Sequence, residues 1–295
     1  MPDRLGFIGL GTMGRPMALN LKRAGAELSV YARRAQALAP LTEAGAIACA
    51  SPAEVGRQAD IIFTMVSDTA DVEEVILGAQ GVSEGARSGS VVVDMSTISP
   101  AVTRSIAARL AEQGVEMLDA PVSGGEQGAI DGTLSIMVGG AESVFERVRP
   151  WFARMGRSIV HVGASGAGQV CKACNQVVIG HTLVGVGEAL LLARAAGVDP
   201  LRVREALLGG FAQSRVLEVH GQRMIEGEYA PGFKARLHQK DMRIILETAA
   251  QLGIALPGAA VFAQSINALV GRGSGELDSS AIHQIQLDLC GRGGP

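Results

Sequence analysis

Three glycines near the N-terminus have the spacing of a dinucleotide-binding loop. Gly9, Gly11 and Gly14 follow the apolar run Leu5 to Ile8 and precede a helical segment. In such a loop the first glycine allows a tight turn, the second lets the backbone approach a pyrophosphate, and the third lets the helix pack against the sheet. A chain with 39 glycines can produce this spacing by chance, but its place between a strand and a helix favours phosphate binding over a structural turn. The expected phosphate-binding residues are Gly9, Leu10, Gly11, Thr12, Met13 and Gly14.

Two arginines indicate which dinucleotide is bound. The strand expected at Leu28 to Tyr31 ends where an NAD site places an acidic residue for the ribose 2′-hydroxyl, but the sequence continues Ala32-Arg33-Arg34. A guanidinium can hold phosphate oxygens through two parallel N–H bonds. The pair therefore predicts NADP(H), with NAD(H) as a second possibility. The alternative is that both arginines begin a solvated helix.

A Ser-Gly-Gly sequence is a candidate for carboxylate binding. Ser123, Gly124 and Gly125 follow the strand expected at Glu116 to Ala120. A hydroxyl and unhindered backbone N–H groups together suit a carboxylate. A flexible glycine-rich loop without a ligand fits the residues equally well.

Polar residues also gather on one expected helix. Lys172, Asn175 and Gln176 have i, i+3 and i+4 spacing, so they share a helix face. A solvated stripe is the ordinary interpretation of such a group, and the same holds for Lys240-Asp241. Burying these polar groups beside apolar neighbours, in contrast, would cost free energy, and we would expect that cost only where the groups have a function.

The composition excludes several classes of protein. A net charge of −3 over 295 residues leaves no basic surface, so we expect no nucleic-acid partner. No signal-peptide pattern and no apolar stretch of membrane-spanning length are evident, so we expect a cytoplasmic protein without a membrane partner. Of the four cysteines, the pair Cys171 and Cys174 is expected to pack as buried or half-buried thiols. The histidines are dispersed, so we expect no metal.

The order of elements predicts an α/β fold in two domains. Residues 1–163 alternate apolar runs with amphipathic segments, which predicts an NADP-binding Rossmann-type doubly wound sheet made of parallel βαβ units. Residues 164–295 are expected to form an all-α substrate and oligomerisation domain, joined by a long helix, with the chemistry in the cleft between the domains. The expected strands are Leu5 to Ile8, Leu28 to Tyr31, Ile61 to Val66, Val91 to Met95, Glu116 to Ala120, Leu134 to Val138 and Ile159 to Val162. The expected helices of the second domain are Gln169 to Ala196, Pro200 to Leu208, Gln213 to Ile225, Leu237 to Leu252, Gly258 to Val270 and Ser279 to Leu289.

Four ordered motifs resemble the β-hydroxyacid dehydrogenases, the family that includes 3-hydroxyisobutyrate dehydrogenase. They are Gly6 to Gly14, Asp119 to Gly125, Gly163 to Gln176 and Lys240-Asp241. The resemblance implies that Lys172 is the catalytic residue. A lysine ammonium, with an ordinary pKa of about 10.4, can supply both a proton and a positive charge to the alkoxide that forms when hydride reaches an aldehyde.

The resemblance also implies roles for other residues. Ser123, Gly124, Gly125, Asn175 and Gln176 are expected to bind the substrate, and Met65, Val66, Ser67, Thr97 and Lys240 are expected to contact the cofactor. It further implies a homodimer or homotetramer that acts on a small carboxylate-bearing aldehyde or hydroxy acid.

Within the family the motifs most resemble the tartronate semialdehyde reductases, which implies reduction of tartronate semialdehyde to glycerate. Alternative substrates are 3-hydroxyisobutyrate, succinic semialdehyde, glyoxylate and serine, and a non-catalytic NADP-binding module is the alternative from another class. The chain has Val66-Ser67 where the family commonly has Leu-Pro. It also has Ala32 where the reductases often carry an acidic residue, and this departure favours NADPH.

Overall fold

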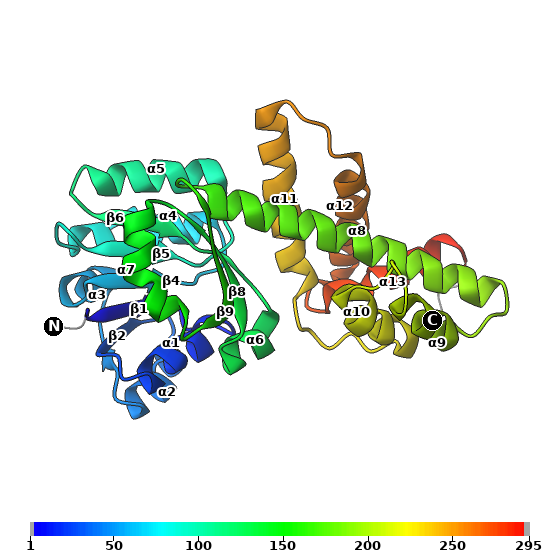
Figure 1. The fold of residues 1–295 in the computed structure, drawn as a ribbon, viewed down its shortest axis with the longest axis horizontal. Helices are drawn as coiled ribbons and strands as arrows, with labels where there is room; N and C mark the ends of the chain where they lie inside the picture. The colour runs from blue at the N-terminus through cyan, green and yellow to red at the C-terminus, as the bar shows by residue number, and fades with distance from the viewer. Residues whose placement is uncertain (1–2, 292–295) are drawn as a thin grey trace. The chain divides into compact units, whose positions relative to one another are not determined.

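The computed structural model describes residues 3–291, so residues 1, 2 and 292–295 of the two expected domains lie outside the description. The chain forms two compact units, Met1–Lys172 and Ala173–Pro295 (Figure 1). The division falls inside the helix α8 (Ala167–Ala195), which begins shortly after the boundary expected between residues 163 and 164. The N-terminal turns of α8 thus belong to the first unit and its remainder to the second.

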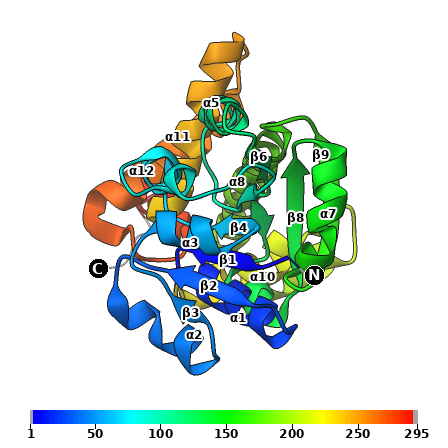
Figure 2. The same ribbon diagram turned by 90° about the vertical axis from the view of Figure 1, so that its left-hand side faces the viewer.

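A single sheet of nine strands forms the centre of the first unit among the described residues (Figure 2). The strand order is β3-β2-β1-β4-β5-β6-β8-β7, and β9 pairs with β8. The strands are β1 (Leu5–Ile8), β2 (Leu28–Tyr31), β3 (Ile47–Ala48), β4 (Ile61–Thr64), β5 (Val91–Asp94), β6 (Glu116–Asp119), β7 (Val122–Ser123), β8 (Leu134–Gly139) and β9 (Gly156–Gly163). All the expected strands are present, and β3 and β7 are additional.

The expected pattern of parallel βαβ units does not extend to one edge of the sheet. β1 to β6 run parallel, but β8 is antiparallel to both β6 and β7. Only the seven-residue helix α6 (Gly125–Asp131) lies between β7 and β8. The chain therefore reverses its direction between β7 and β8, as antiparallel neighbours require.

Helices cover both faces of the sheet, as the doubly wound prediction requires. Successive side chains of a strand point to opposite faces, so Phe7 packs in one buried cluster and Ile8 in the other. The first cluster includes residues of α1 (Gly14–Arg23), α2 (Ala39–Glu43), α6 and α7 (Glu142–Phe152). The second includes residues of α3 (Pro52–Gln58), α4 (Thr69–Leu77) and α5 (Pro100–Ala111) (Figure 1). The Rossmann-type sheet is thus confirmed.

The second unit forms no strand among residues 173–291. Its helices after α8 are α9 (Pro200–Leu208), α10 (Arg215–Glu226), α11 (Ala235–Leu252), α12 (Pro257–Leu269) and α13 (Ile282–Leu289). Short 3₁₀ segments occur at Ala35–Ala37, Val82–Glu84 and Ser279–Ala281, and a π-helical one at Val270–Ser274. Asp199 caps α9, because its carboxylate accepts a hydrogen bond from the N–H of Leu201 at 2.9 Å. The all-α prediction is confirmed.

Two expectations about α8 need correction. By length and composition it qualifies as a helix that could cross a membrane, with a mean hydropathy of 1.6, although no stretch of that kind was expected. A single such helix is weak evidence, since core helices of soluble proteins also qualify. Cys171 is half-buried as expected, but Cys174 is exposed, because it lies on the side of α8 opposite to buried Lys172 and Gln176.

Candidate functional site

The glycine loop between β1 and α1 leaves open space at one position. Gly9 has a φ of +97°, and a Cβ there would collide with the carbonyl oxygen of Met65. At Gly14 a Cβ would collide with the carbonyl oxygen of Gly9. At Gly11, in contrast, no atom lies within 4 Å of the Cβ position. The first and third glycines are therefore needed for packing, whereas the second borders space that a ligand can enter.

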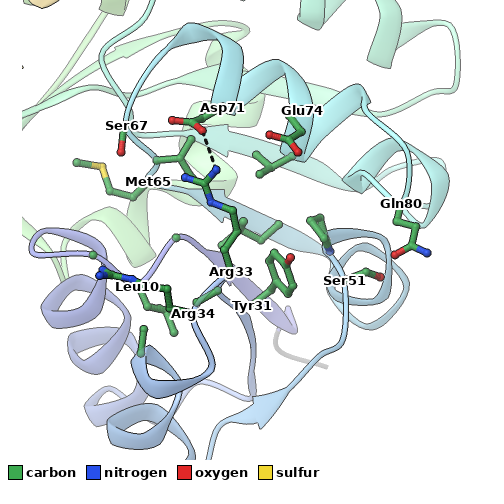
Figure 3. A pocket seen from close by; sticks show the side chains of 18 of the residues that line it. Leu10, Tyr31, Arg33, Arg34, Ser51, Met65, Ser67, Asp71, Glu74 and Gln80 are labelled. Carbon is green, nitrogen blue, oxygen red and sulfur yellow. Dashed lines mark ion pairs between the residues drawn. The ribbon is translucent and has the colours of Figure 1, made fainter.

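A cavity of about 500 Å³ opens beside this loop, entirely within the first unit (Figure 3). The predicted cofactor residues that line it are Gly9, Leu10, Gly11, Ala32, Arg33, Arg34, Met65, Val66 and Ser67. These residues come from the segments that follow β1, β2 and β4, where the C-terminal edge of a doubly wound sheet binds nucleotides. The cavity, the open Gly11 and the two arginines together fit a dinucleotide.

The other predicted cofactor residues do not line this cavity. Thr12 and Met13 precede α1, Gly14 is its first residue, and Thr97 lies between β5 and α5. Lys240 is part of α11 in the second unit. Their roles toward the cofactor stay predictions.

Sequence reasoning missed an acidic side of the cavity. Asp71 and Glu74 of α4 line it together with the arginines. The guanidinium of Arg33 points toward Asp71 and lies 3.2 Å from its carboxylate (Figure 3). The Arg33 side chain is 68% exposed and that of Asp71 is 24% exposed. The Arg33 guanidinium, which is predicted to bind a 2′-phosphate, is therefore paired with Asp71 in this structure.

The sequence analysis did not predict that eight further residues line the cavity, although it predicted the strands that end at two of them, Ile8 and Tyr31. The eight residues are Ile8, Tyr31, Ala37, Ser51, Pro52, Val75, Ala79 and Gln80. Ser51 follows the two-residue strand β3 and caps α3 by accepting a hydrogen bond from the N–H of Glu54 at 3.2 Å. A Ser-Pro pair at a helix start is a recognisable signal, although it indicates only the helix and not the cavity.

Lys172 is buried in the second turn of α8, with only 7% of its surface exposed. Gln176 is 2% exposed. The interpretation of these residues as a solvated stripe is therefore wrong, and a buried ammonium requires compensating polar contacts. The catalytic role of Lys172 stays a prediction.

In the second unit, the predicted polar residues form a chain of contacts. Nδ2 of Asn175 donates to Oε1 of Gln176 at 2.8 Å, and Nε2 of Gln176 donates to the Asp241 carboxylate at 2.6 Å. The ammonium of Lys240 lies 3.1 Å from the other oxygen of Asp241. Asp241 is therefore the common acceptor that orients Gln176 and Lys240, a role that the sequence analysis did not assign.

The Ser-Gly-Gly sequence is more ordered than a flexible loop. Ser123 ends β7, and Gly124 and Gly125 begin α6 with φ values of +137° and +65°. Positive φ values explain why both positions are glycines. None of the three lines the cavity described above, so their role in substrate binding stays a prediction.

Two buried carboxylates end the neighbouring strands β5 and β6. Asp94 and Asp119 are paired in the register of the sheet and are 0% and 1% exposed. Burial raises the pKa of Asp94 to about 6, against the lowering effect of hydrogen bonds from Ser96 and Thr64. Burial also raises the pKa of Asp119, although backbone N–H groups, including that of Gly166, donate to it. Neither residue was expected from the sequence to belong to a polar network.

Comparison with known proteins defines the family. Residues 4–163 match the family model described as the NAD binding domain of 6-phosphogluconate dehydrogenase. Residues 166–285 match the one described as NAD-binding of NADP-dependent 3-hydroxyisobutyrate dehydrogenase. Together the two matches span both units.

Individual relatives agree with these matches. The 2-hydroxy-3-oxopropionate reductase of Escherichia coli (strain K12) is 50% identical over 281 residues, covering 95% of this chain and 96% of the reductase. The 2-(hydroxymethyl)glutarate dehydrogenase of Eubacterium barkeri is 36% identical, covering 98% of this chain and 96% of that enzyme. A solved structure of Mycobacterium tuberculosis 3-hydroxyisobutyrate dehydrogenase with L-serine has a TM-score of 0.90 at 30% identity, covering 97% of this chain and 99% of that chain. The chain therefore belongs to the 3-hydroxyisobutyrate dehydrogenase-like family of nicotinamide-dependent β-hydroxyacid dehydrogenases.

Proposed function

We propose that the protein reduces tartronate semialdehyde (2-hydroxy-3-oxopropanoate) to glycerate, with NADP(H) preferred to NAD(H) and Lys172 as the general acid. The observation that carries the substrate is the 50% identity, over 95% of the chain, to an enzyme named 2-hydroxy-3-oxopropionate reductase.

The preference for NADP(H) rests on the two arginines that line the cavity. Arg33 and Arg34 follow β2, where an acidic residue would bind the 2′-hydroxyl of NAD. A 2′-phosphate would bring a charge that can displace Asp71 from Arg33, because phosphate accepts two parallel hydrogen bonds from a guanidinium. An NAD ribose offers no such group. The cavity is therefore better matched to the phosphorylated cofactor.

The chemistry assigned to Lys172 follows from its charge and burial. When bound, the reduced nicotinamide supplies the hydride to the aldehyde carbon. Lys172 donates a proton to the aldehyde oxygen as negative charge develops there, so the carbonyl becomes a hydroxyl. A buried ammonium stabilises this charge more strongly than one in water, since the local dielectric constant is lower. By resemblance, Asn175 and the Ser123 to Gly125 segment hold the substrate hydroxyl and carboxylate.

A panel of small semialdehydes, each assayed with NADPH and with NADH, tests this proposal. The panel contains tartronate semialdehyde, succinic semialdehyde and methylmalonate semialdehyde, the oxidised form of 3-hydroxyisobutyrate. We expect the highest kcat/KM for tartronate semialdehyde with NADPH. A higher kcat/KM for another aldehyde would overturn the substrate, and equal values with both cofactors would overturn the NADP(H) preference.

Oxidation of 3-hydroxyisobutyrate is the second candidate function. It is favoured by the likeness to the Mycobacterium tuberculosis 3-hydroxyisobutyrate dehydrogenase, at 30% identity over 97% of this chain. Both reactions interconvert an aldehyde and an alcohol in a small carboxylic acid. The two substrates differ only in the group on the carbon next to the carboxylate, which is a hydroxyl in one and a methyl in the other. Assaying 3-hydroxyisobutyrate oxidation with NADP⁺ next to glycerate oxidation separates them.

A further inference from the structure

The side chain of Gln169 clamps the first turn of α8 to the segment that follows β5. Its Oε1 accepts a hydrogen bond from the N–H of Ile98 at 3.1 Å, and its Nε2 donates to the carbonyl oxygen of Ser96 at 2.8 Å. The two bonds bracket Thr97, which is predicted to contact the cofactor. Gln169 is only 1% exposed, so water cannot replace either bond without rearrangement.

The backbone of the same turn is held from a second direction. Oδ1 and Oδ2 of Asp119 accept hydrogen bonds from the N–H groups of Gly166 at 2.7 Å and Gln169 at 2.9 Å. These groups belong to the helix N-terminus, where the backbone N–H groups have no partners within the helix. At Gly168 a Cβ would lie 2.6 Å from the carbonyl oxygen of Asp119, so the helix touches β6 directly. The turn has no room to slide toward the sheet.

The clamp continues to the cofactor cavity through Ser96. The hydroxyl oxygen of Ser96 accepts a hydrogen bond from the N–H of Val66 at 3.0 Å, and the N–H of Ser96 donates to Asp94 at 3.1 Å. Val66 lines the cavity. A single residue, Ser96, therefore contacts the cavity wall on one side and Gln169 on the other.

Lys172 lies one helical turn after Gln169. Three residues advance an α-helix by about 4.5 Å, so any shift of the first turn moves the Lys172 backbone with it. We propose that Gln169 is a positioning residue that holds Lys172 at a fixed distance from Val66, which lines the cofactor cavity, and from Thr97, which is predicted to contact the cofactor. This inference rests on the proposed function, because it takes Lys172 as the proton donor.

The simpler interpretation is that Gln169 only stabilises the fold. The two interpretations differ in the kinetic step that they affect. A structural role lowers the amount of folded enzyme and leaves the turnover of each folded molecule unchanged. A positioning role slows hydride and proton transfer in the folded enzyme, because misplacement by about 1 Å can reduce a rate about 100-fold.

Substitution by methionine removes the clamp while keeping the side-chain volume. For Q169M we expect kcat to fall about 10- to 100-fold, with the Kd for NADPH within about threefold of wild type. We also expect the primary isotope effect on kcat with 4-deuterated NADPH to rise, since hydride transfer becomes slower than product release. The matched control is Q286M. Gln286 is also buried, at 8% exposure, and donates to the carbonyl oxygen of Val184 at 3.0 Å, but it belongs to the second unit.

A second variant, Q169E, keeps the proposal testable if Q169M folds poorly. A carboxylate cannot donate to the Ser96 carbonyl, whereas a protonated carboxyl can. Relative to wild type at the same pH, we expect Q169E activity to recover as pH falls. Activity of Q169E that stays at a constant fraction of wild type at every pH would contradict the clamp.

The outcomes separate this inference from the proposed function. Wild-type kcat and isotope effect in Q169M, or an equal loss of kcat in Q286M, would overturn the positioning role. If Lys172→Met also retained activity, the proposed general acid itself would be wrong. A loss of activity in Lys172→Met beside unchanged activity in Q169M would overturn only the inference drawn here.

Discussion

The cofactor cavity and the start of α8 belong to the same unit but use polar groups in opposite ways. In the cavity, Arg33 is 68% exposed and its ion pair with Asp71 faces solvent. At the start of α8, Asp119 and Gln169 are each 1% exposed and bond to backbone groups of neighbouring elements. One region carries exposed charges, whereas the other is a buried hydrogen-bond network.

This difference corresponds to two different tasks. Exposed ion pairs contribute about 0 to 1 kcal/mol and weaken in salt, so they can exchange partners when a ligand arrives. Buried hydrogen bonds are costly to break, because a donor or acceptor is left without a partner and without water. The exposed arginines therefore suit the selection of a cofactor, and the buried network suits the holding of Lys172 in one place.

The largest effect that this comparison predicts is on turnover. Lys172→Met should lower kcat about 1,000-fold, within the range for losing a general acid, and leave the Kd for NADPH within about twofold of wild type. Steady-state assays and fluorescence titration with NADPH measure the two quantities. Lys22→Met is the control, because Lys22 is a half-buried lysine of α1 in the same unit. Wild-type turnover in Lys172→Met would exclude it as the proton donor.

The second effect is on cofactor selection. Replacing both Arg33 and Arg34 with alanine should raise the Kd for NADPH about 30- to 100-fold, since hydrogen bonds to charged groups contribute about 1.5 to 3 kcal/mol. The Kd for NADH should change less than about threefold. The Arg109→Ala, Arg149→Ala double variant, at exposed positions of α5 and α7, controls for the loss of two positive charges. Equal losses for both cofactors would refute the assignment to the 2′-phosphate.

The third effect is a dependence of protein stability on pH, which we expect from buried Asp94 and not from the exposed region. The pKa of Asp94 is raised from its ordinary value of 3.8 to about 6 in the folded protein. The folded state therefore binds more protons than the unfolded chain between these values, so the free energy of unfolding falls as pH rises through this window. From pH 4.5 to pH 7.5 the stability of D94N should improve relative to wild type by about 2 kcal/mol.

Urea denaturation of wild type and D94N at both pH values measures this change. Comparing the variants across pH cancels any constant cost of the amide substitution. D71N is the control, because Asp71 belongs to the exposed region. A D94N stability difference from wild type that is the same at both pH values would show that Asp94 titrates normally.

The smallest effect is expected at the exposed ion pair. D71N should increase the affinity for NADPH about two- to fivefold at low salt by releasing Arg33, in keeping with about 0.5 to 1 kcal/mol for such a pair. The gain should disappear at high salt. E74Q removes an equal charge from the same cavity wall, so an equal gain in E74Q would indicate a general charge effect instead of the Arg33 pair.

Most of the fold could be predicted from local patterns. Pro100 after Ser99 and Pro200 after Asp199 are typical of helix starts, and both begin a helix whose preceding side chain accepts a backbone hydrogen bond. β3 and β7 could not be predicted, because two residues show no periodicity. The antiparallel edge at β8 was also missed, since alternation of strands and helices indicates parallel units by default.

The parts of the candidate site that could be predicted are those whose residues lie in one continuous segment of the chain. Gly9 to Gly11 and Arg33-Arg34, which line the cavity, could be named as candidates because each group is contiguous in the chain. Asp71 and Gln169 were not found, because their importance depends on contacts with Arg33, Ser96 and Ile98. An aspartate on a helix or a glutamine before a lysine has no distinctive local pattern.

The most direct test of the division between the two regions is a crossed measurement on two variants. The Kd for NADPH and the rate of tartronate semialdehyde reduction at saturating NADPH are measured for Lys172→Met and for the Arg33→Ala, Arg34→Ala double variant. We expect the first variant to keep the affinity and lose the rate, and the second variant to lose the affinity and keep the rate. Loss of both quantities in both variants would contradict this expectation.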